Sequence, residues 1–294
     1  MNSLAHSHKL ALGTAQFGLK YGLANAANKV PRDMVEQLLK VASAFNITML
    51  DTAIAYGDSE QVLGLYNLAK FEIVSKLPAV PSNCLNIEEW VLEQTMFSLK
   101  RLKTDKLHDL LLHRPAQLLG TNGEKIYKSI LKLKEQGMVD QIGVSVYGPD
   151  ELSELIKRFD FDVIQAPMNI FDRRMEHTGM LKHLKKKGVT IHIRSAFLQG
   201  LLLMPSEKIP VYFAPWAPLI KQYHQWLNQQ SLSPLQACLS YLNQHSDIDK
   251  IIVGVDNIWQ LKQIIAAIDT PITDIPDFLQ STDEGLLNPS RWQR

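Results

Sequence analysis

The chain has 294 residues, 46% of them hydrophobic and 21% charged, as is typical of a globular protein with a sizeable core. Lysine and arginine number 31 against 30 aspartates and glutamates, so no field of one sign favours nucleic acid or an anionic membrane as a partner. The two cysteines, Cys84 and Cys238, lie far apart and outside any ligand-spaced cluster, which argues against a disulfide framework or a metal site.

Short apolar runs alternate with longer segments of helical period along nearly the whole chain. Each run is about four to seven residues long, and its near-continuous apolar character is typical of parallel strands covered on both faces. In chain order the predicted strands are Leu10–Gly13, Thr48–Asp51, Phe71–Lys76, Asp109–His113, Gln141–Ser145, Val163–Pro167, Thr190–Ser195 and Lys250–Gly254.

Amphipathic helices are predicted between the strands, among them Glu88–Leu102, Glu124–Gln136 and Pro149–Ile156. Eight βα units fit either a closed barrel or an open doubly wound sheet. A dinucleotide-binding open sheet predicts GxGxxG after the first strand, which residues 13–18 do not match. We therefore expect an α/β fold, a single-domain (β/α)8 TIM barrel over residues 1–294, with the tail at 270–294 as a candidate cap for the barrel mouth.

In such a barrel, residues at the carboxyl ends of the strands line one catalytic mouth. There the sequence places Asp51, Tyr56, Lys76 and His113, from three successive strands. A buried lysine beside a tyrosine hydroxyl stabilises the phenolate and lowers its pKa from about 10, while a carboxylate keeps the lysine charged. Together these residue types indicate proton donation to a carbonyl oxygen on which negative charge develops during hydride transfer.

The segment at 51–64, DTAIAYGDSEQVLG, resembles the aldo-keto reductase signature DTAxxYGxSExxLG. The resemblance implies a TIM barrel in which Asp51, Tyr56, Lys76 and His113 form the catalytic tetrad, with Tyr56 as general acid. Further similarities follow in the family's order over roughly residues 10–265, namely GTAQFG at 13–18, VSK at 74–76, LHRP at 112–115, GVS at 143–145, QAPMN at 165–169, FDRR at 171–174 and QGLL at 199–202.

The resemblance also implies a reduced nicotinamide cofactor, NADPH with NADH as the alternative, bound across the mouth without a Rossmann domain. Carried over by position, Ser145 and Gln165 would hold the carboxamide, residues 195–200 the pyrophosphate, and residues 254–263 the adenosine phosphate. The cofactor contacts expected on this basis are Gly13, Thr14, Gln16, Ser145, Gln165, Arg194, Ser195, Phe197, Gly200, Gly254 and Gln260.

Three positions depart from the family's pattern. Val146 follows Ser145 where many members have asparagine, which puts one carboxamide contact in doubt. Arg194 stands where many members stack an aromatic ring on the nicotinamide. Its guanidinium would favour the reduced cofactor, bind an anionic group of the substrate, or pair with a nearby acid. Third, Lys262 is the only base near the expected adenosine phosphate site, so the choice between NADPH and NADH stays open.

The predicted function is NAD(P)H-dependent reduction of a small aldehyde or ketone, with a sugar-derived carbonyl among the candidates. Two alternatives stay open: a non-catalytic nicotinamide-binding sensor or partner subunit on the same fold, and a Schiff-base aldolase with Lys76 as nucleophile. No apolar run reaches the ~18 residues of a membrane span and residues 1–10 lack a secretory signal. We therefore expect a cytoplasmic protein, by default a monomer, with no membrane or nucleic-acid partner.

Overall fold

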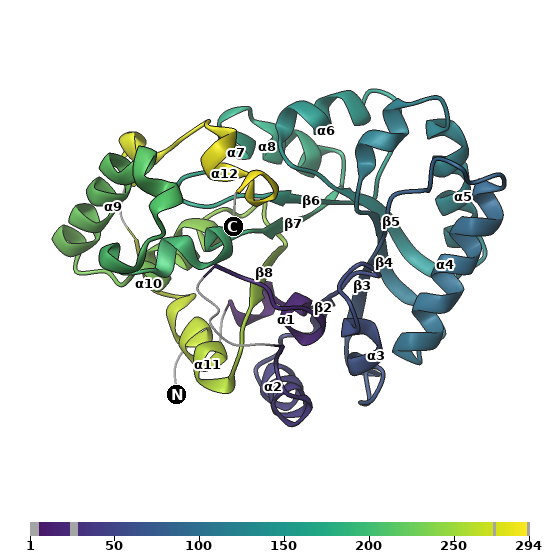
Figure 1. The fold of residues 1–294 in the computed structure, drawn as a ribbon, viewed down its shortest axis with the longest axis horizontal. Coiled ribbons are helices and arrows are strands. Elements are labelled where there is room, and N and C mark those ends of the chain that lie inside the picture. Colours follow the sequence, from purple (N-terminus) through teal and green to yellow (C-terminus); the bar gives the residue numbers. More distant parts are fainter. Residues whose placement is uncertain (1–5, 24–28, 273–274, 293–294) are drawn as a thin grey trace.

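The structure is a computed structural model that describes residues 6–23, 29–272 and 275–292. Its parallel strands close into a barrel in sequence order, so that β8 pairs with β1 (Figure 1). Every predicted strand is present, with its ends shifted by two residues at most, which confirms the (β/α)8 barrel. The strands are β1 (Leu10–Gly13), β2 (Met49–Asp51), β3 (Glu72–Leu77), β4 (Leu107–Leu112), β5 (Val139–Ser145), β6 (Val163–Pro167), β7 (Thr190–Arg194) and β8 (Lys250–Gly254).

The barrel is packed inside and out because side chains alternate in direction along each strand. On β1, Leu10 and Leu12 belong to the large core under the helices, while Ala11 belongs to a separate cluster inside the barrel. That inner cluster consists of Ala11, Met49, Val74, Leu111, Val163 and Ile252. The residue two positions after each of these faces the same way, one layer closer to the carboxyl ends of the strands.

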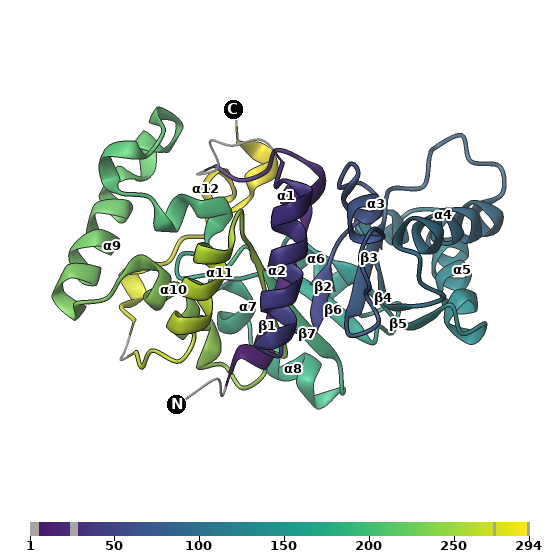
Figure 2. The same ribbon diagram turned by 90° about the horizontal axis from the view of Figure 1, so that it is seen from below.

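Helices surround the barrel, and two of them, α2 and α11, lie side by side outside β1 and β8 (Figures 1 and 2). The helix predicted from Glu88 begins one residue earlier, where the Asn86 side chain accepts a hydrogen bond from the Glu89 amide at 3.2 Å. The longer helices are α2 (Arg32–Ala44), α4 (Ile87–Leu102), α5 (Gly123–Glu135), α6 (Pro149–Leu155), α8 (Met180–Lys186), α9 (Ala217–Gln230), α10 (Pro234–Asn243) and α11 (Ile258–Ala267). Single-turn helices occur in the loops as α1 (Ala15–Gly18), α3 (Ser59–Leu63), α7 (Arg174–His177) and α12 (Glu284–Leu287).

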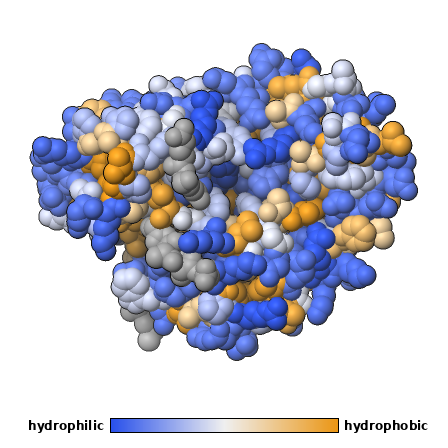
Figure 3. Space-filling model, in the orientation of Figure 1, coloured by the Kyte–Doolittle hydropathy of each residue, from blue (hydrophilic) through white to orange (hydrophobic). Residues whose placement is uncertain are grey.

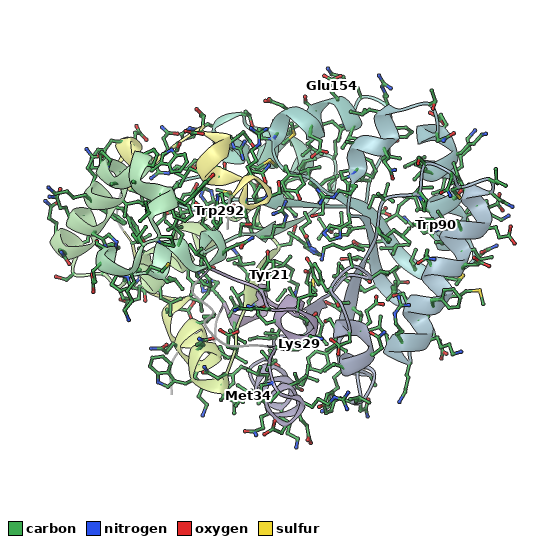
Figure 4. All side chains as sticks on the ribbon, in the orientation of Figure 1. Tyr21, Lys29, Met34, Trp90, Glu154 and Trp292 are labelled. Atoms are coloured by element: carbon green, nitrogen blue, oxygen red, sulfur yellow. The ribbon has the colours of Figure 1, made fainter. Side chains whose placement is uncertain are left out.

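The C-terminal tail packs on loops that follow β6 and β7, at the carboxyl ends of the strands. The Ser281 amide donates to the Phe171 carbonyl at 2.8 Å, and Trp292, labelled in Figure 4, packs edge-on against Phe213 with ring centroids 4.9 Å apart. None of the described tail residues lines the main cavity at the mouth. The tail therefore covers the loops beside that cavity, and its role as a cap stays a prediction.

The face shown in Figure 3 is mostly hydrophilic, with apolar side chains scattered between charged and polar ones. Among the helices in the described part of the chain, none has both the length and the apolar character needed to cross a bilayer.

Candidate active site

Three of the four predicted catalytic side chains, those of Asp51, Lys76 and His113, belong to the layer directly above the apolar filling of the barrel. Asp51 lies two residues beyond Met49 of the inner cluster, and Lys76 two beyond Val74, whereas Tyr56 lies on the loop after β2. The same spacing places Gly13, His113, Gln165 and Gly254 at the mouth, after Ala11, Leu111, Val163 and Ile252. The two-residue period of a strand thus gathers residues up to 241 positions apart into one ring, from 13 to 254.

A buried ion pair lies at the centre of this ring. The Lys76 Nζ donates to both carboxylate oxygens of Asp51, at 2.7 and 2.8 Å, and to the Thr52 carbonyl at 2.8 Å. The Lys76 side chain is only 1% exposed. Burial lowers the pKa of Lys76, and the Asp51 carboxylate opposes that change. A lysine held by three acceptors in this way has one position, with its charge directed at Asp51 and the Thr52 carbonyl.

The ion pair is extended by two polar side chains from the opposite side of the barrel. Gln165 Nε2 donates to Asp51 Oδ1 at 2.7 Å, and Ser145 Oγ donates to Gln165 Oε1 at 3.0 Å. The structure therefore brings the two predicted carboxamide ligands together. Ser145 lies behind Gln165 and does not line the cavity, so Gln165 alone of the two faces it.

Tyr56 is positioned by a close approach of two backbone segments. A Cβ on Gly18 would lie 1.8 Å from the Tyr56 carbonyl oxygen, and one on Gly57 would lie 2.5 Å from the Gly18 carbonyl oxygen. Gly57 also has φ +59°, which disfavours other residues. The glycines of the two motifs thus allow the turn after β1 to pack directly on the loop that carries the tyrosine.

Two further residues of the motif have structural roles. The Ser59 hydroxyl donates to the Thr14 hydroxyl at 2.9 Å, and Thr14 in turn donates to the Asp51 carbonyl at 3.0 Å. Glu60, 2% exposed, accepts hydrogen bonds from Ser75 and Ser98 at 2.6 Å each. These bonds fasten the tyrosine loop to neighbouring elements, and they show that the Thr14 side chain serves the fold as well as lining the cavity.

Tyr56, His113 and Lys76 meet at the mouth. The Tyr56 and His113 rings lie edge to face with centroids 5.7 Å apart, and the Lys76 Nζ is 5.1 Å from the Tyr56 ring centroid. Burial and the charge of Asp51 raise the pKa of Tyr56, while Arg194 opposes the rise. Burial, then Lys76 and Arg194, lowers the pKa of His113 to about 3.

The expected lowering of the Tyr56 pKa by Lys76 is therefore wrong for this structure. The ammonium makes its close contacts with Asp51 and Thr52, so its charge is largely offset by the carboxylate. The raised pKa nonetheless keeps Tyr56 in the protonated form that a proton donor needs. At neutral pH Tyr56 carries its proton and His113 is uncharged.

A cavity of about 380 Å³ opens from this site and extends to the start of α11. Asp51 and Tyr56 line one part of it, whereas Lys76 lies behind Asp51. Ten of the eleven predicted cofactor residues line it, namely Gly13, Thr14, Gln16, Gln165, Arg194, Ser195, Phe197, Gly200, Gly254 and Gln260. Asp256, Trp259 and Gln263 also line it, within the stretch 254–263 that was expected to meet the adenosine phosphate. Tyr21, which lines it too, lies outside every predicted stretch, and no pattern in the sequence singled it out.

The loop after β7 holds an unusual backbone along this cavity. Leu198, Gln199 and Gly200 have successive φ values of 46°, 52° and 94°, all in the left-handed region, and Ser195 has φ 60°. Backbone strain of this kind collects at ligand clamps. The Leu198 and Gly200 amides are used within the loop, where they donate to the Ser195 and Phe197 carbonyls at 2.9 and 2.8 Å. The Gln199 carbonyl accepts from the Leu23 amide at 2.8 Å, so the segment after α1, which includes Tyr21 near the middle of Figure 4, reaches this loop across the cavity.

Arg194 is held by neutral partners. Its guanidinium lies over the Tyr147 ring, 5.0 Å from the centroid, and donates to the Val146 carbonyl at 2.9 Å. Among the described residues no acid lies within ion-pair distance of it, so the salt-bridge interpretation is not supported there. At Val146, where many members of the family have asparagine, the backbone carbonyl thus binds Arg194.

Comparison with known proteins agrees with this geometry. Residues 9–276 match the model of the Aldo/keto reductase family. The chain is 24% identical over 280 residues to the "uncharacterized oxidoreductase YqkF" of Bacillus subtilis, covering 88% of this chain and 90% of that protein. It is also 24% identical over 208 residues to the "NADH-specific methylglyoxal reductase" of Escherichia coli, covering 63% of this chain and 61% of that protein.

Solved structures show the same fold. The holo form of aldo-keto reductase AKR11C1 from Bacillus halodurans superposes with a TM-score of 0.71 at 20% sequence identity, covering 90% of this chain and 88% of that one. A family match over nearly the whole chain, on a barrel with this ring of polar residues at its mouth, settles the relationship. The chain belongs to the aldo/keto reductase family of oxidoreductases.

Proposed function

We propose that this protein reduces an aldehyde or ketone to an alcohol, with a proton from Tyr56 and hydride from a nicotinamide cofactor. The observation that carries the proposal is the meeting of a protonated phenol, an uncharged imidazole and a buried lysine–carboxylate pair at the barrel mouth, where Tyr56 and Asp51 line the cavity. A reduced nicotinamide supplies the hydride when bound; every other part of the chemistry belongs to residues of this chain.

The cavity fits a dinucleotide in its donor set. Gln165 uses one N–H and one lone pair of its amide within the protein, which leaves a second of each for a carboxamide. The strained left-handed turn at residues 198–200 brings backbone close to the cavity, which Gln199 and Gly200 line, as ligand clamps do. The flat indole of Trp259, 67% exposed, lines the far end and offers a surface for a base.

The side chains at the mouth are suited to protonate an oxygen. The Tyr56 hydroxyl donates its proton to the carbonyl oxygen as negative charge develops there, and uncharged His113, whose ring lies edge to face with that of Tyr56, adds a second hydrogen bond. Tyr56 is left as a phenolate until a proton returns from solvent. The charge of Arg194, which opposes the rise in the pKa of Tyr56, favours this anion. Asp51 holds the Lys76 ammonium in position throughout.

The aldolase alternative is disfavoured by the same contacts. A Schiff base requires an uncharged lysine amine with access to substrate. Here Lys76 directs three donors to Asp51 and Thr52 and does not line the cavity. Sequence alone left this alternative open because it does not show which way the lysine points.

The test is substitution of Tyr56 by phenylalanine. We expect turnover of a generic aldehyde with NADH or NADPH to fall by about 10² to 10⁴, the usual contribution of a positioned general acid, with cofactor binding retained. Tyr127→Phe is the matched control, because it removes one hydroxyl, bonded to the Asp160 carbonyl, on the outside of the barrel. Absence of turnover in the wild type, or equal turnover in Y56F, would overturn the proposal and leave the non-catalytic binding protein as the better interpretation.

A further inference from the structure

Tyr147, in the loop after β5, is held at the barrel mouth through its backbone. Its amide donates to the Glu151 carboxylate at 2.9 Å, and its carbonyl accepts from the Arg174 guanidinium at 3.2 Å. Arg174 is itself paired with Asp172 at 2.8 Å and with Glu284, so its charge is offset. The Tyr147 backbone therefore has one position, from which its ring contacts residues that follow other strands.

Two arginines from different strands meet on this ring. The guanidinium carbon of Arg194, the last residue of β7, lies 5.0 Å from the Tyr147 ring centroid, and that of Arg114, two residues after β4, lies 5.7 Å from it. Arg114 also donates to the Tyr147 hydroxyl at 3.0 Å. An aromatic face and neutral oxygens hold a guanidinium in place without cancelling its charge. Two positive charges are thus fixed around one tyrosine at the mouth.

Neither of these guanidiniums forms an ion pair in the part of the chain that the structure describes. The arginines that do so there are Arg101, Arg173 and Arg174. Arg194 uses one N–H on the Val146 carbonyl at 2.9 Å and another on the Ser195 hydroxyl at 3.3 Å. A guanidinium has five N–H donors, so Arg194 keeps donors for an acidic group from outside the chain.

Both charges act at the point where the carbonyl would be reduced. Arg194 lines the cavity together with Tyr56. Burial lowers the pKa of His113 most, and the charges of Lys76, Arg194 and Arg114 lower it further. Of these three cations Lys76 is paired with Asp51, so the two arginines are the ones available to a ligand.

We infer that the carbonyl substrate of this enzyme carries an anionic group, a carboxylate or a phosphate, which Arg194 and Arg114 bind beside Tyr147. The inference rests on the proposed function, because it names the class of substrate for that same site. The planar fork of a guanidinium pairs with two oxygens of either group. An anion bound near both arginines also relieves the repulsion between their charges. Arg194 is partly buried, so its contact with an anion is screened less by water than a contact on an open surface.

The experiment compares 4-formylbenzoate, an anion, with its neutral methyl ester as substrates of the full chain with NADH or NADPH. We expect kcat/KM to be about tenfold or more higher for the anion at low ionic strength, mainly through a lower KM, because complementary charges favour association. The ester is the more electrophilic aldehyde, so intrinsic reactivity alone predicts the opposite order. Added salt should reduce the ratio, since it screens the attraction.

A second pair of substrates, glyceraldehyde 3-phosphate and glyceraldehyde, distinguishes the two kinds of anion. A preference for the anion in the first pair alone assigns a carboxylate to the substrate, and a preference in the second pair alone assigns a phosphate. Either result supports the inference.

Variants test which residues cause the preference. Arg194→Gln should lower the anion-to-neutral ratio of kcat/KM by about tenfold, and Arg194→Lys, which keeps the charge without the fork, should lower it less. Arg114→Gln should have a smaller effect than R194Q, because Arg114 is exposed. Any effect of Arg194 on proton transfer from Tyr56 cancels in the ratio, since both substrates need the same proton. Arg158→Gln is the matched control: it removes an exposed charge shortly before β6 begins, away from the mouth, and should leave the ratio unchanged.

The outcomes separate this inference from the proposed function. Equal or lower kcat/KM for both anions than for their neutral partners overturns the inference and leaves the reductase standing. An equal loss with anion and neutral partner in R194Q would assign Arg194 to the cofactor or to Tyr56, and overturns it too. The wild-type ratio is informative even where a variant does not fold. Absence of turnover with all four substrates overturns the proposed function as well.

Discussion

Lys76 and Asp51 show how much the site depends on single side chains. Each is nearly inaccessible to water, and each is the principal partner of the other's charge. Removing one partner of a buried ion pair leaves an uncompensated charge in a poorly solvated place. The pair therefore connects the stability of the barrel mouth to its chemistry.

This dependence predicts the behaviour of Lys76→Met. We expect the free energy of unfolding to fall by about 3–5 kcal/mol, the cost of stranding the other charge. The double variant D51N/K76M should lose less than the sum of the two single variants, since no stranded charge remains. Urea denaturation of the four proteins measures this cycle. Strict additivity would mean that the two side chains do not depend on each other.

At the scale of elements, the turn after β1 and the loop after β2 are joined by backbone contact at Gly18 and Gly57. This contact fixes the Tyr56 loop to the paired strands β1 and β2. Glu60 adds a second attachment through Ser75 of β3 and Ser98 of α4. Both ends of the loop that carries the tyrosine are thus fixed. A general acid needs such a fixed position, because it must donate its proton to the same place in every turnover.

Gly57→Ala tests this arrangement. Its Cβ would meet the Gly18 carbonyl at 2.5 Å in addition to the left-handed φ of +59°. Gly137→Ala is the matched control, because it has φ +74° with no atom within 4 Å of the new Cβ. We expect about 1–2 kcal/mol of destabilisation for G137A from backbone conformation alone, and clearly more for G57A, together with loss of turnover. Equal losses in denaturation midpoint would show that the close approach is unimportant.

At the scale of the whole molecule, the barrel interior buries a histidine below the catalytic layer. His192 on β7 is inaccessible to water, and its Nδ1 is 3.8 Å from Asp109 Oδ2. Neither ring nitrogen has a hydrogen-bond partner among the described residues. Burial lowers the pKa of His192, with the carboxylate of Asp109 opposing the change.

From the burial of His192 we predict that the free energy of unfolding of the whole protein decreases in acid. Because the folded pKa lies below the unfolded value of about 6.5, the unfolded chain binds more protons under acidic conditions. Stability should therefore fall as pH drops below that value, and His113, with a pKa lowered to about 3, adds to the same trend. His192→Leu should give a shallower decline of the melting temperature between neutral and mildly acidic pH. Parallel curves for variant and wild type would contradict this account.

Much of the architecture could be predicted from local sequence patterns. The eight strands and the placement of Asp51, Lys76 and His113 at one mouth follow from short apolar runs and a two-residue period, both of which are local properties. Tyr56 was assigned to the mouth because it closely follows the second strand, within the motif at 51–64. The secondary structure between β7 and β8 was harder to predict. There the chain forms short 3-10 turns and α9, which depend on packing against the tail.

Only closure of the barrel decided which way the side chains at the mouth point, which charges offset one another and which side chains water reaches. Closure turned the Lys76 ammonium toward Asp51 and buried Tyr56, and burial, followed by the charge of Asp51, raises the pKa of Tyr56 where sequence predicted a fall. It also placed Arg194 on Tyr147 and brought Asp256 into the same cavity as residues from β1. Sequence determined which chemical groups this protein has and on which strand each lies. Their electrostatics came from neighbours distant along the chain, because charge and burial depend on distance in space.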